Sequence, residues 1–353
     1  MKRNIWFLAV AASAVLAGCS KDDDGDLSPS MLDKDWYRIE DSADPTDHVR
    51  YEIYSEYGLP VFYNDTIGSD FRGYSMDGSP VTHYEVIDFG YWITYVDGAP
   101  KMTYKLNEAY LLRNDKSEVK AGVEFVRDYV LPSLPERLYP MSLLLVDDMV
   151  RNYASDARGC HEFRTFQGLT CMAVGRVGQI AGMSEAEKKY HAGYVMATLF
   201  AEDIVDNHDY QVEFEAFFDA AEKKSDGTSY CNTQLVGRNS NTSRPAYILQ
   251  KPDEPGKRLH WLSYGFLNFS IENLVYLAYE NGVINRDLSQ VDTKCTGYYT
   301  PSYEQDLRDY IAEVLVGDDA AFEQKYAEYP KVLERYRIMK QLFAEYRAGF
   351  GEE

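Results

Sequence analysis

The chain has 353 residues, 45% of them hydrophobic, and its 57 acidic residues against 36 lysines and arginines give a formal net charge of −21. This balance argues against binding to a nucleic-acid backbone and against docking on an anionic membrane surface, because both depend on Lys and Arg. The length fits one large domain or two, with enough apolar side chains for a sizeable core.

The N-terminus has the pattern of a secretory signal. A basic start is followed by an apolar stretch over residues 5–16, which is shorter than the roughly 20 residues that a membrane-spanning helix needs. Leu-Ala-Gly at 16–18 followed by Cys19 resembles a bacterial lipobox. We therefore expect residues 1–18 to be removed as a signal peptide and Cys19 to carry the lipid anchor.

An acidic tether follows the cysteine over residues 19–30, with the run Lys-Asp-Asp-Asp-Gly-Asp at 21–26. Acidic runs stay solvated and do not pack, so a tether is one interpretation. The run also resembles the export tag of Bacteroidetes-type lipoproteins. That resemblance implies an outer-membrane protein that faces the cell exterior.

The next part of the chain mixes helices and strands. Hydrophobic periodicity, turn residues and caps predict helices over 45–57 and 117–131, and strands over 59–63, 81–96 and 104–112. The segments 142–146 and 169–174 are continuous apolar runs, which are typical of central strands.

The second half reads as mostly helical. Ser184 and Glu187 form a capping box that opens a long helix to 206, with Tyr190, Tyr194, Leu199, Phe200 and Ile204 expected on its buried face. Further helices are expected over 212–223, over 271–279, from Pro301 and over 331–348, with a long loop at 224–258. Strands mixed with helices and then helices alone indicate an α+β fold.

Four cysteines remain after Cys19, at positions 160, 171, 231 and 295. Export makes disulfides feasible, and four cysteines allow three pairings among which the sequence does not choose. Cys160 with Cys171 is the local candidate, because the intervening loop is short. A zinc site of cysteines is not indicated, since the sequence has no C-x-x-C spacing.

Several stretches resemble one protein family. They are residues 47–54, 61–66, the helix that begins at 184, and residues 212–216, 264–266 and 303–307. These stretches are similar to the zinc metallopeptidase-like lipoproteins associated with TonB-dependent substrate import. The resemblance implies a zincin-like α+β domain over 31–353, with a helical subdomain over 259–353 as an alternative division.

The family motif is H-E-x-x-H on the long helix, where two imidazoles one turn apart hold zinc and the glutamate activates water. Alignment places this motif at Ala197, Thr198 and Ala201, which supply neither imidazole nor carboxylate. The resemblance therefore implies a degenerate site with no catalytic residue, and we expect no cofactor. It also implies partners: the outer membrane, a TonB-dependent transporter system and a peptide or glycan ligand, but no nucleic acid.

An active zinc metallohydrolase with atypical ligands is the first alternative, and His191, His208 and Glu304 are its candidate ligands. The pair His161-Glu162 also begins like the motif, but Thr165 stands where the second histidine belongs. The zinc content of the purified protein separates this alternative from a non-catalytic role.

A glycan-binding module is the second alternative. The chain has 30 tyrosines and four tryptophans, and an aromatic ring with a polar edge can stack on sugars. Trp92, Trp261 and Tyr264 are the candidate platforms. Retardation by glycan in a native gel tests this interpretation.

Overall fold

The structure is a computed structural model, and it describes residues 34–87, 91–96, 99–105, 110–149, 151–153, 156–160, 164–168, 170–231, 233–238, 245–247, 261–268 and 297–351. The chain divides into two compact units, Met1–Trp36 and Tyr37–Glu353. The predicted signal peptide, Cys19, the tether and the helix over 271–279 lie outside the described residues. Among the described residues, we find no helix with the length and apolar character needed to cross a bilayer.

A four-stranded mixed sheet organises the body. Its order is β1 (Val61–Phe62), β7 (Leu143–Leu145), β12 (Met172–Val174) and β11 (Thr165–Gln167). The first three strands run parallel, and β11 pairs antiparallel with β12 at the edge. β7 and β12 are the two inner strands, which confirms the prediction made from their continuous apolar sequence.

Alternate residues of this sheet belong to two separate hydrophobic clusters, because successive side chains of a strand point to opposite faces. One face joins a large cluster with the helices through Val61, Leu143, Leu145, Met172 and Val174. The other face packs against Ile39 and Ile87 through Phe62, Leu144, Val146, Cys171 and Ala173. Both faces are buried, so the three parallel strands carry only apolar side chains, whereas the edge strand β11 also has Thr165 and Gln167.

Four helices lie on the large-cluster side of the sheet: α2 (Pro45–Tyr57), α3 (Lys116–Phe125), α4 (Val177–Ile180) and α5 (Glu185–Asp206). α2 begins where the Asp44 side chain accepts from two backbone N–H groups, and it ends at Gly58 with φ of 68°. α3 continues as one π-helical turn over Val126–Val130. The predicted helices over 45–57 and 184–206 are thus confirmed to within one residue.

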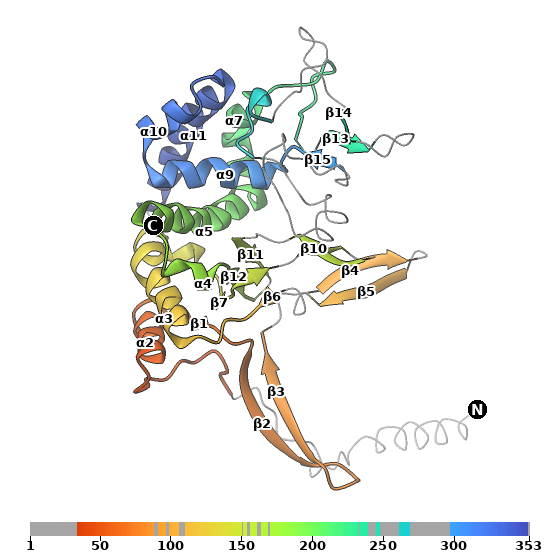
Figure 1. Ribbon diagram of the computed structural model, residues 1–353, viewed down its shortest axis with the longest axis vertical. Coiled ribbons are helices and arrows are strands. Elements are labelled where there is room, and N and C mark those ends of the chain that lie inside the picture. The colour runs from red at the N-terminus through yellow and green to blue at the C-terminus, as the bar shows by residue number, and fades with distance from the viewer. Residues whose placement is uncertain are drawn as a thin grey trace, which may run out of the picture. The chain divides into compact units, whose positions relative to one another are not determined.

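The C-terminal helices pack against α5 on the side away from the sheet (Figure 1). They are α6 (His208–Glu213), α7 (Glu215–Asp219), α9 (Tyr303–Val316), α10 (Asp319–Lys325) and α11 (Pro330–Ala348). Their apolar residues belong to the same large cluster as the sheet and α5. The described part of 259–353 therefore shares one apolar cluster with α5 and the sheet.

The remaining strands form small sheets. They are β2 (Thr66–Tyr74) with β3 (Pro80–Val86), β4 (Tyr91–Val96) with β5 (Ala99–Lys105), β6 (Tyr110–Leu111) with β8 (Asp148–Met149), β9 (Arg151–Tyr153) with β10 (Asp156–Cys160), and β13 (Gln234–Arg238) between β14 (Pro245–Tyr247) and β15 (Gly297–Tyr299). A short 3₁₀ helix covers Trp261–Tyr264.

Three expectations need correction. The segment 224–258 contains strands β13 and β14, so it is not a loop throughout, and the helix expected over 212–223 is instead α6 and α7. α9 begins after Ser302, not at Pro301. The mixed α/β architecture holds, but strands also occur in the second half.

Candidate functional site

The long helix α5 carries the positions that resemble a metal-binding motif. Its first turn is fixed by the predicted capping box, in which Ser184 accepts from the N–H of Glu187 and the Glu187 carboxylate accepts from the N–H of Ser184. The helix then runs between the sheet and α9 (Figure 1). With both sides covered, eleven of its residues are buried, so local sequence and packing both support a single long helix.

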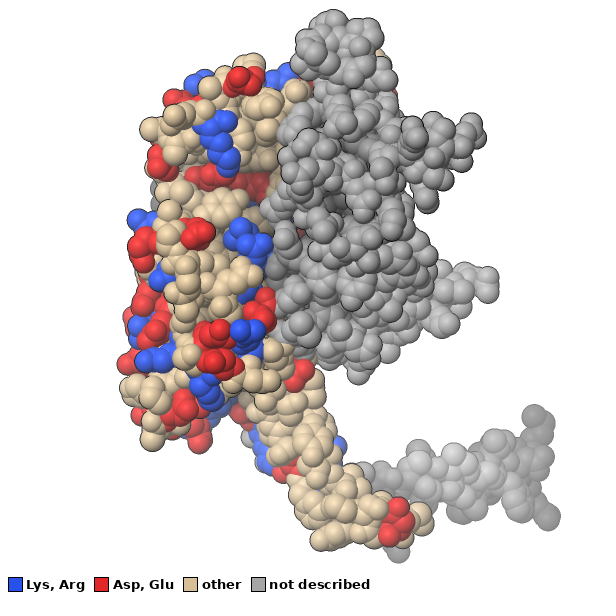
Figure 2. Space-filling model, in the orientation of Figure 1, with Lys and Arg blue, Asp and Glu red and all other residues tan. Residues whose placement is uncertain are grey.

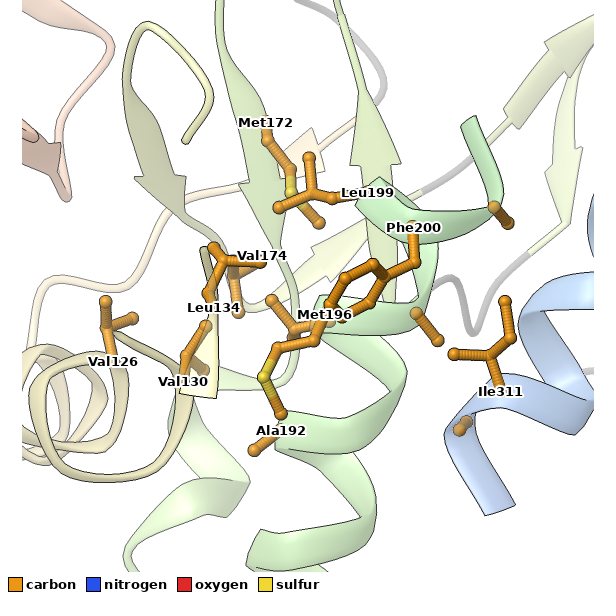
Figure 3. Packing of buried hydrophobic residues seen from close by; sticks show 14 of the residues in the cluster. Val126, Val130, Leu134, Met172, Val174, Ala192, Met196, Leu199, Phe200 and Ile311 are labelled. Atoms are coloured by element: carbon orange, nitrogen blue, oxygen red, sulfur yellow. The ribbon is translucent and has the colours of Figure 1, made fainter. Parts of the chain in front are cut away.

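Side chains of neighbouring elements bury the centre of this helix. Leu199, Phe200 and Ile204 are buried as predicted, whereas Tyr190 and Tyr194 are only partly buried. In Figure 3, the α5 side chains lie among residues of the sheet, the π-helical turn and α9. The ring of Phe200 meets that of Phe343 edge-on, with 4.9 Å between the centroids.

Two of the motif positions hold only methyl groups. Ala197 and Ala201 both have 0% exposure and belong to the large apolar cluster. They lie one turn apart, so their side chains share one face of the helix. Neither methyl group has a lone pair to offer, and the positions therefore do not fit a metal ion.

Thr198 stands at the position that the sequence resemblance aligns with a glutamate. Its hydroxyl donates to the Tyr194 carbonyl at 3.0 Å and lies 2.7 Å from the Thr165 hydroxyl on β11. A hydroxyl has one proton, so with that proton on the carbonyl, Thr165 is the donor to Thr198. Both side chains are buried. The pair holds the edge strand to α5, and a hydrogen-bonded hydroxyl at this position cannot take the general-base role of a glutamate.

His191 is a core residue with a neutral ring. Its exposure is 0%, its Nε2 donates to the Gly175 carbonyl at 3.1 Å, and its ring stacks on Phe125 at 5.1 Å. Burial lowers the pKa of His191 to about 3, with a further contribution from Arg164. The other ring nitrogen, Nδ1, is buried without a hydrogen-bond partner among the described residues.

The alternative ligands do not come together. His208 is exposed at the start of α6, and about 15 residues of α5 separate His191 from the helix end, or roughly 22 Å. Glu304 is about half exposed and faces Arg308 at 3.9 Å. Over the whole described part of the chain, no group of three or more His, Cys, Asp or Glu residues is placed to hold a metal ion.

The segment that contains the candidate ligand Glu304 instead builds the fold. Gln305 completes a capping box with Ser302 at the start of α9. The Asp306 carboxylate accepts from Arg335 on α11 at 3.1 Å, and the two side chains are 1% and 0% exposed. This carboxylate is therefore already engaged in a buried ion pair.

Arg335 is fully surrounded by partners. Its guanidinium also donates to the carbonyls of Gly265 at 2.6 Å and Phe217 at 3.2 Å, and it lies 4.0 Å from the Phe217 ring centroid. Tyr310 donates to the same Gly265 carbonyl at 2.7 Å. The network ties α7, α9, α11 and the 3₁₀ segment together, which is a structural role that sequence reasoning missed.

One carboxyl group next to the motif positions has a raised pKa. Burial, reinforced by the charges of Asp206 and Glu304, raises the pKa of Glu202 to about 7. This side chain follows Ala201 on α5 and is partly buried. It can exchange a proton near neutral pH, but among the described residues it belongs to no group of His, Cys, Asp or Glu that could hold a metal ion, so the arrangement does not define a reaction.

The cysteines and aromatic candidates give a mixed result. Cys171 is a free, buried thiol whose pKa is raised to about 12 by burial. A free Cys171 does not support the predicted disulfide with Cys160. The side chains of Cys160 and Trp92, and the residues His161-Glu162, lie outside the described part of the chain. Trp261 and Tyr264 are only 7% and 2% exposed, so they cannot serve as glycan-stacking platforms.

Comparison with known proteins adds no relative: no protein-family model, no curated protein and no solved structure matches the chain.

Proposed function

We propose that this chain is a non-catalytic protein with a zincin-like fold, anchored in the outer membrane through a lipid on Cys19 and facing the cell exterior. Its role would be to assist TonB-dependent import of a peptide or glycan. The observation that supports the proposal most is the occupancy of the motif positions by Ala197, Thr198 and Ala201, two of which have 0% exposure.

The zincin-like part of the proposal rests on topology. A long helix lies against a mixed sheet whose edge strand, β11, runs antiparallel to its neighbour. The buried bond between Thr165 and Thr198 joins this edge strand to the helix at the motif position. The C-terminal helices cover the other side of α5, and α9 contains the stretch 303–307 that resembles the family.

The non-catalytic part rests on chemistry. A catalytic zinc site needs three protein ligands and an open coordination position. Here both helical imidazoles and the general base are replaced, and such groups act as a unit, so losing all of them removes the activity. Alanine is a strong helix former, which allows the helix to persist without the site. Binding or assembly is then the role that remains for an anchored acidic body.

Metal and activity measurements on the purified full chain test this proposal. After incubation with zinc and removal of free metal, we expect far less than one zinc per chain and no chelator-sensitive cleavage of a peptide library. One zinc per chain together with such cleavage would replace the proposal by the metallohydrolase alternative.

Fractionation of cells tests the anchor separately. Cys19→Ala should move the protein from the membrane fraction to the soluble fraction, because acyl chains supply the membrane affinity. Cys231→Ala, which removes a thiol in the folded body, is the matched control and should stay with the membrane. Equal membrane partitioning of both variants would contradict the anchor.

A further inference from the structure

Exposed apolar side chains gather on the β2–β3 hairpin. Nine large hydrophobic side chains are exposed in the described part of the chain, and six of them lie on this hairpin: Phe71, Tyr74, Met76, Val81, Tyr84 and Val86. The hairpin extends away from the four-stranded sheet (Figure 1). In Figure 2, it is mostly tan, with few charged side chains on the side that is visible.

The register of the hairpin sorts its side chains onto two faces. Ser69 lies opposite Tyr84, Phe71 opposite Thr82, and Tyr74 opposite Pro80, with bulges after Thr66 and Phe71. Since directly paired residues of an antiparallel ladder share a face, one face consists of Thr66, Ser69, Phe71, Tyr74, Pro80, Thr82, Tyr84 and Val86. We call this the aromatic face.

The two faces differ in charge and cover. None of the eight members of the aromatic face is charged, and all eight are exposed; Arg72, also exposed, is the extra residue of the bulge between Phe71 and Gly73 and is paired on neither face. The opposite face carries Asp70, His83 and Glu85, with His83 3.1 Å from Glu85, and its residues other than Val81 are partly covered. The apolar surface is therefore directional and continuous, with Phe71 and Tyr74 in edge-on contact at 5.2 Å.

A two-stranded hairpin is marginal by itself, and its stability usually requires cover on its apolar face. Four large side chains here are more than half exposed: Phe71 at 55%, Tyr74 at 73%, Met76 at 109% and Tyr84 at 60%. Met76 lies in the turn and is not part of the aromatic face. Phe71, Tyr74 and Tyr84, together with the other five exposed members of that face, present roughly 600 Å² of surface, which is at the upper end for a monomer and is often functional.

We propose that the aromatic face is covered by the same face of a second copy of this chain. Two such faces would bury roughly 1,200 Å², which exceeds the approximately 1,000 Å² that a specific interface needs. A two-fold axis presents one patch to itself, so the patch must tolerate its own charge. Each chain carries −21, and this uncharged face is a surface on which two copies can meet without opposing like charges.

A lipid surface fits less well. The aromatic face runs the length of both strands from Val86 to Tyr74, whereas insertion into a bilayer would favour apolar residues concentrated at the tip. At the tip, the exposed Met76 is followed by the charged Asp77, whose carboxylate accepts from the Ser79 N–H at 3.0 Å. A second copy covers the whole face with the two sheets about 10 Å apart.

Native mass spectrometry of the detergent-solubilised full chain counts the copies directly over a concentration series. We expect a dimer that dissociates on dilution. The double variant Phe71→Ser/Tyr84→Ser should be a monomer at every concentration at which the unchanged chain is a dimer, while circular dichroism shows that both are folded.

A matched pair of valines on β3 tests the face assignment. Val86 and Val81 are 39% and 42% exposed but lie on opposite faces. Val86→Ser should weaken dimerisation about tenfold, as expected for one apolar side chain at an interface, and Val81→Ser should change it less than about twofold.

Three outcomes would overturn the proposal: a monomer at the highest concentration, a dimer that survives the double variant, or equal effects of the two valine variants. Flotation of the Cys19→Ala chain with phosphatidylethanolamine vesicles, if Phe71→Ser/Tyr84→Ser abolishes it, would assign the face to lipid and likewise reject the second copy.

Discussion

The centre of α5 and the β2–β3 hairpin use apolar side chains in opposite ways. Around α5, the positions that resemble a catalytic motif are filled with methyl groups and aromatic rings that have no exposed surface. On the hairpin, rings of similar size lie in the open. The sequence resemblance points to the helix as the functional site, whereas the exposure of apolar side chains points to the hairpin.

This comparison shows which region has surface that is available to a partner. On α5, Thr198 and His191 already have partners within the fold, and so does Asp306 on the neighbouring α9. On the hairpin, Phe71 and Tyr84 contribute surface that the described fold does not use. A site for a partner is expected where surface remains unused, so the two regions should respond to mutation in opposite ways.

Rebuilding the motif should have the largest effect. Ala197→His/Thr198→Glu/Ala201→His inserts two imidazoles and a carboxylate into a packed core. Each insertion costs about 1–3 kcal/mol by overpacking, so we expect a loss of about 4–6 kcal/mol in the free energy of unfolding, without zinc binding. Urea denaturation and metal analysis of the purified variant measure both.

α11 offers a matched control for that experiment. Ala344 and Ala348 have the same spacing but are exposed, and Glu345 already lies between them. Ala344→His/Ala348→His therefore places the same H-E-x-x-H pattern on a helix surface and should cost no more than about 1 kcal/mol. A rebuilt α5 as stable as this control, with one zinc per chain, would show that the α5 site is open.

Breaking the buried ion pair should come next. Arg335→Ala leaves the Asp306 carboxylate uncompensated and buried, which costs about 3–5 kcal/mol of unfolding free energy. Arg337 is the control on the same helix: it pairs with Glu323 at 3.1 Å, and both side chains are more than half exposed. Arg337→Ala should cost about 0.5 kcal/mol or less. Equal losses for the two variants would contradict the role of burial.

Much of the fold could be predicted where local chemistry determines it. Asp44 and Gly58 fix the ends of α2, and Ser184 fixes the start of α5, because caps act within one turn. β2 was missed, since the two glycines and the aspartate in Thr66–Tyr74 hide a strand that is defined by its pairing with β3. Register with a distant segment leaves no local signal.

The start of α9 shows how a distant contact overrides a local signal. Thr300 followed by proline is a good cap pattern, but the Thr300 hydroxyl accepts from the Thr233 N–H at 2.8 Å and also donates to the Tyr230 carbonyl. With this side chain engaged elsewhere, Ser302 caps the helix instead.

The candidate site could be predicted only by its residues, not by their contacts. The sequence placed Ala197, Thr198 and Ala201 at the motif, and it could have marked Arg335 as unusual because it lies on the apolar stripe with Val332 and Met339. The ion partner of Arg335 is 29 residues away on another helix. No periodicity connects the two.

Acid should weaken the α5 region through His191. Its pKa in the folded state is about 3, below the ordinary 6.5. The unfolded chain therefore binds a proton that the folded chain does not, and stability present above pH 6.5 is lost as pH falls toward 3. The slope is about 1.4 kcal/mol per pH unit, so about 2 kcal/mol is lost between pH 6.5 and 5. His191→Gln should remove this loss in urea denaturation at pH 5 and 7.5.

His48 provides a control with the opposite sign. It is exposed, and its hydrogen bond to Asp41 raises its pKa. The stability it contributes is present at low pH and is lost as pH rises through its folded-state pKa. His48→Gln should therefore shift the pH dependence in the other direction, and a shift of the same sign for both variants would refute the assignment for His191.

The smallest effect on stability is expected on the hairpin. Phe71→Ser/Tyr84→Ser changes two exposed rings, so the free energy of unfolding should move by no more than about 0.5 kcal/mol per site when measured at concentrations where the chain is monomeric. Phe200→Ala in α5 should cost about 3–5 kcal/mol in the same assay, because it opens a cavity in the core. If the hairpin variant is as costly as Phe200→Ala, the aromatic face is part of the monomer's own core, and its exposure would not reflect a binding surface. If the hairpin variant leaves the stability of the monomer unchanged yet prevents the dimer, the two rings serve association and not folding. The rings of the hairpin would then differ in role from those around α5, which stabilise the fold.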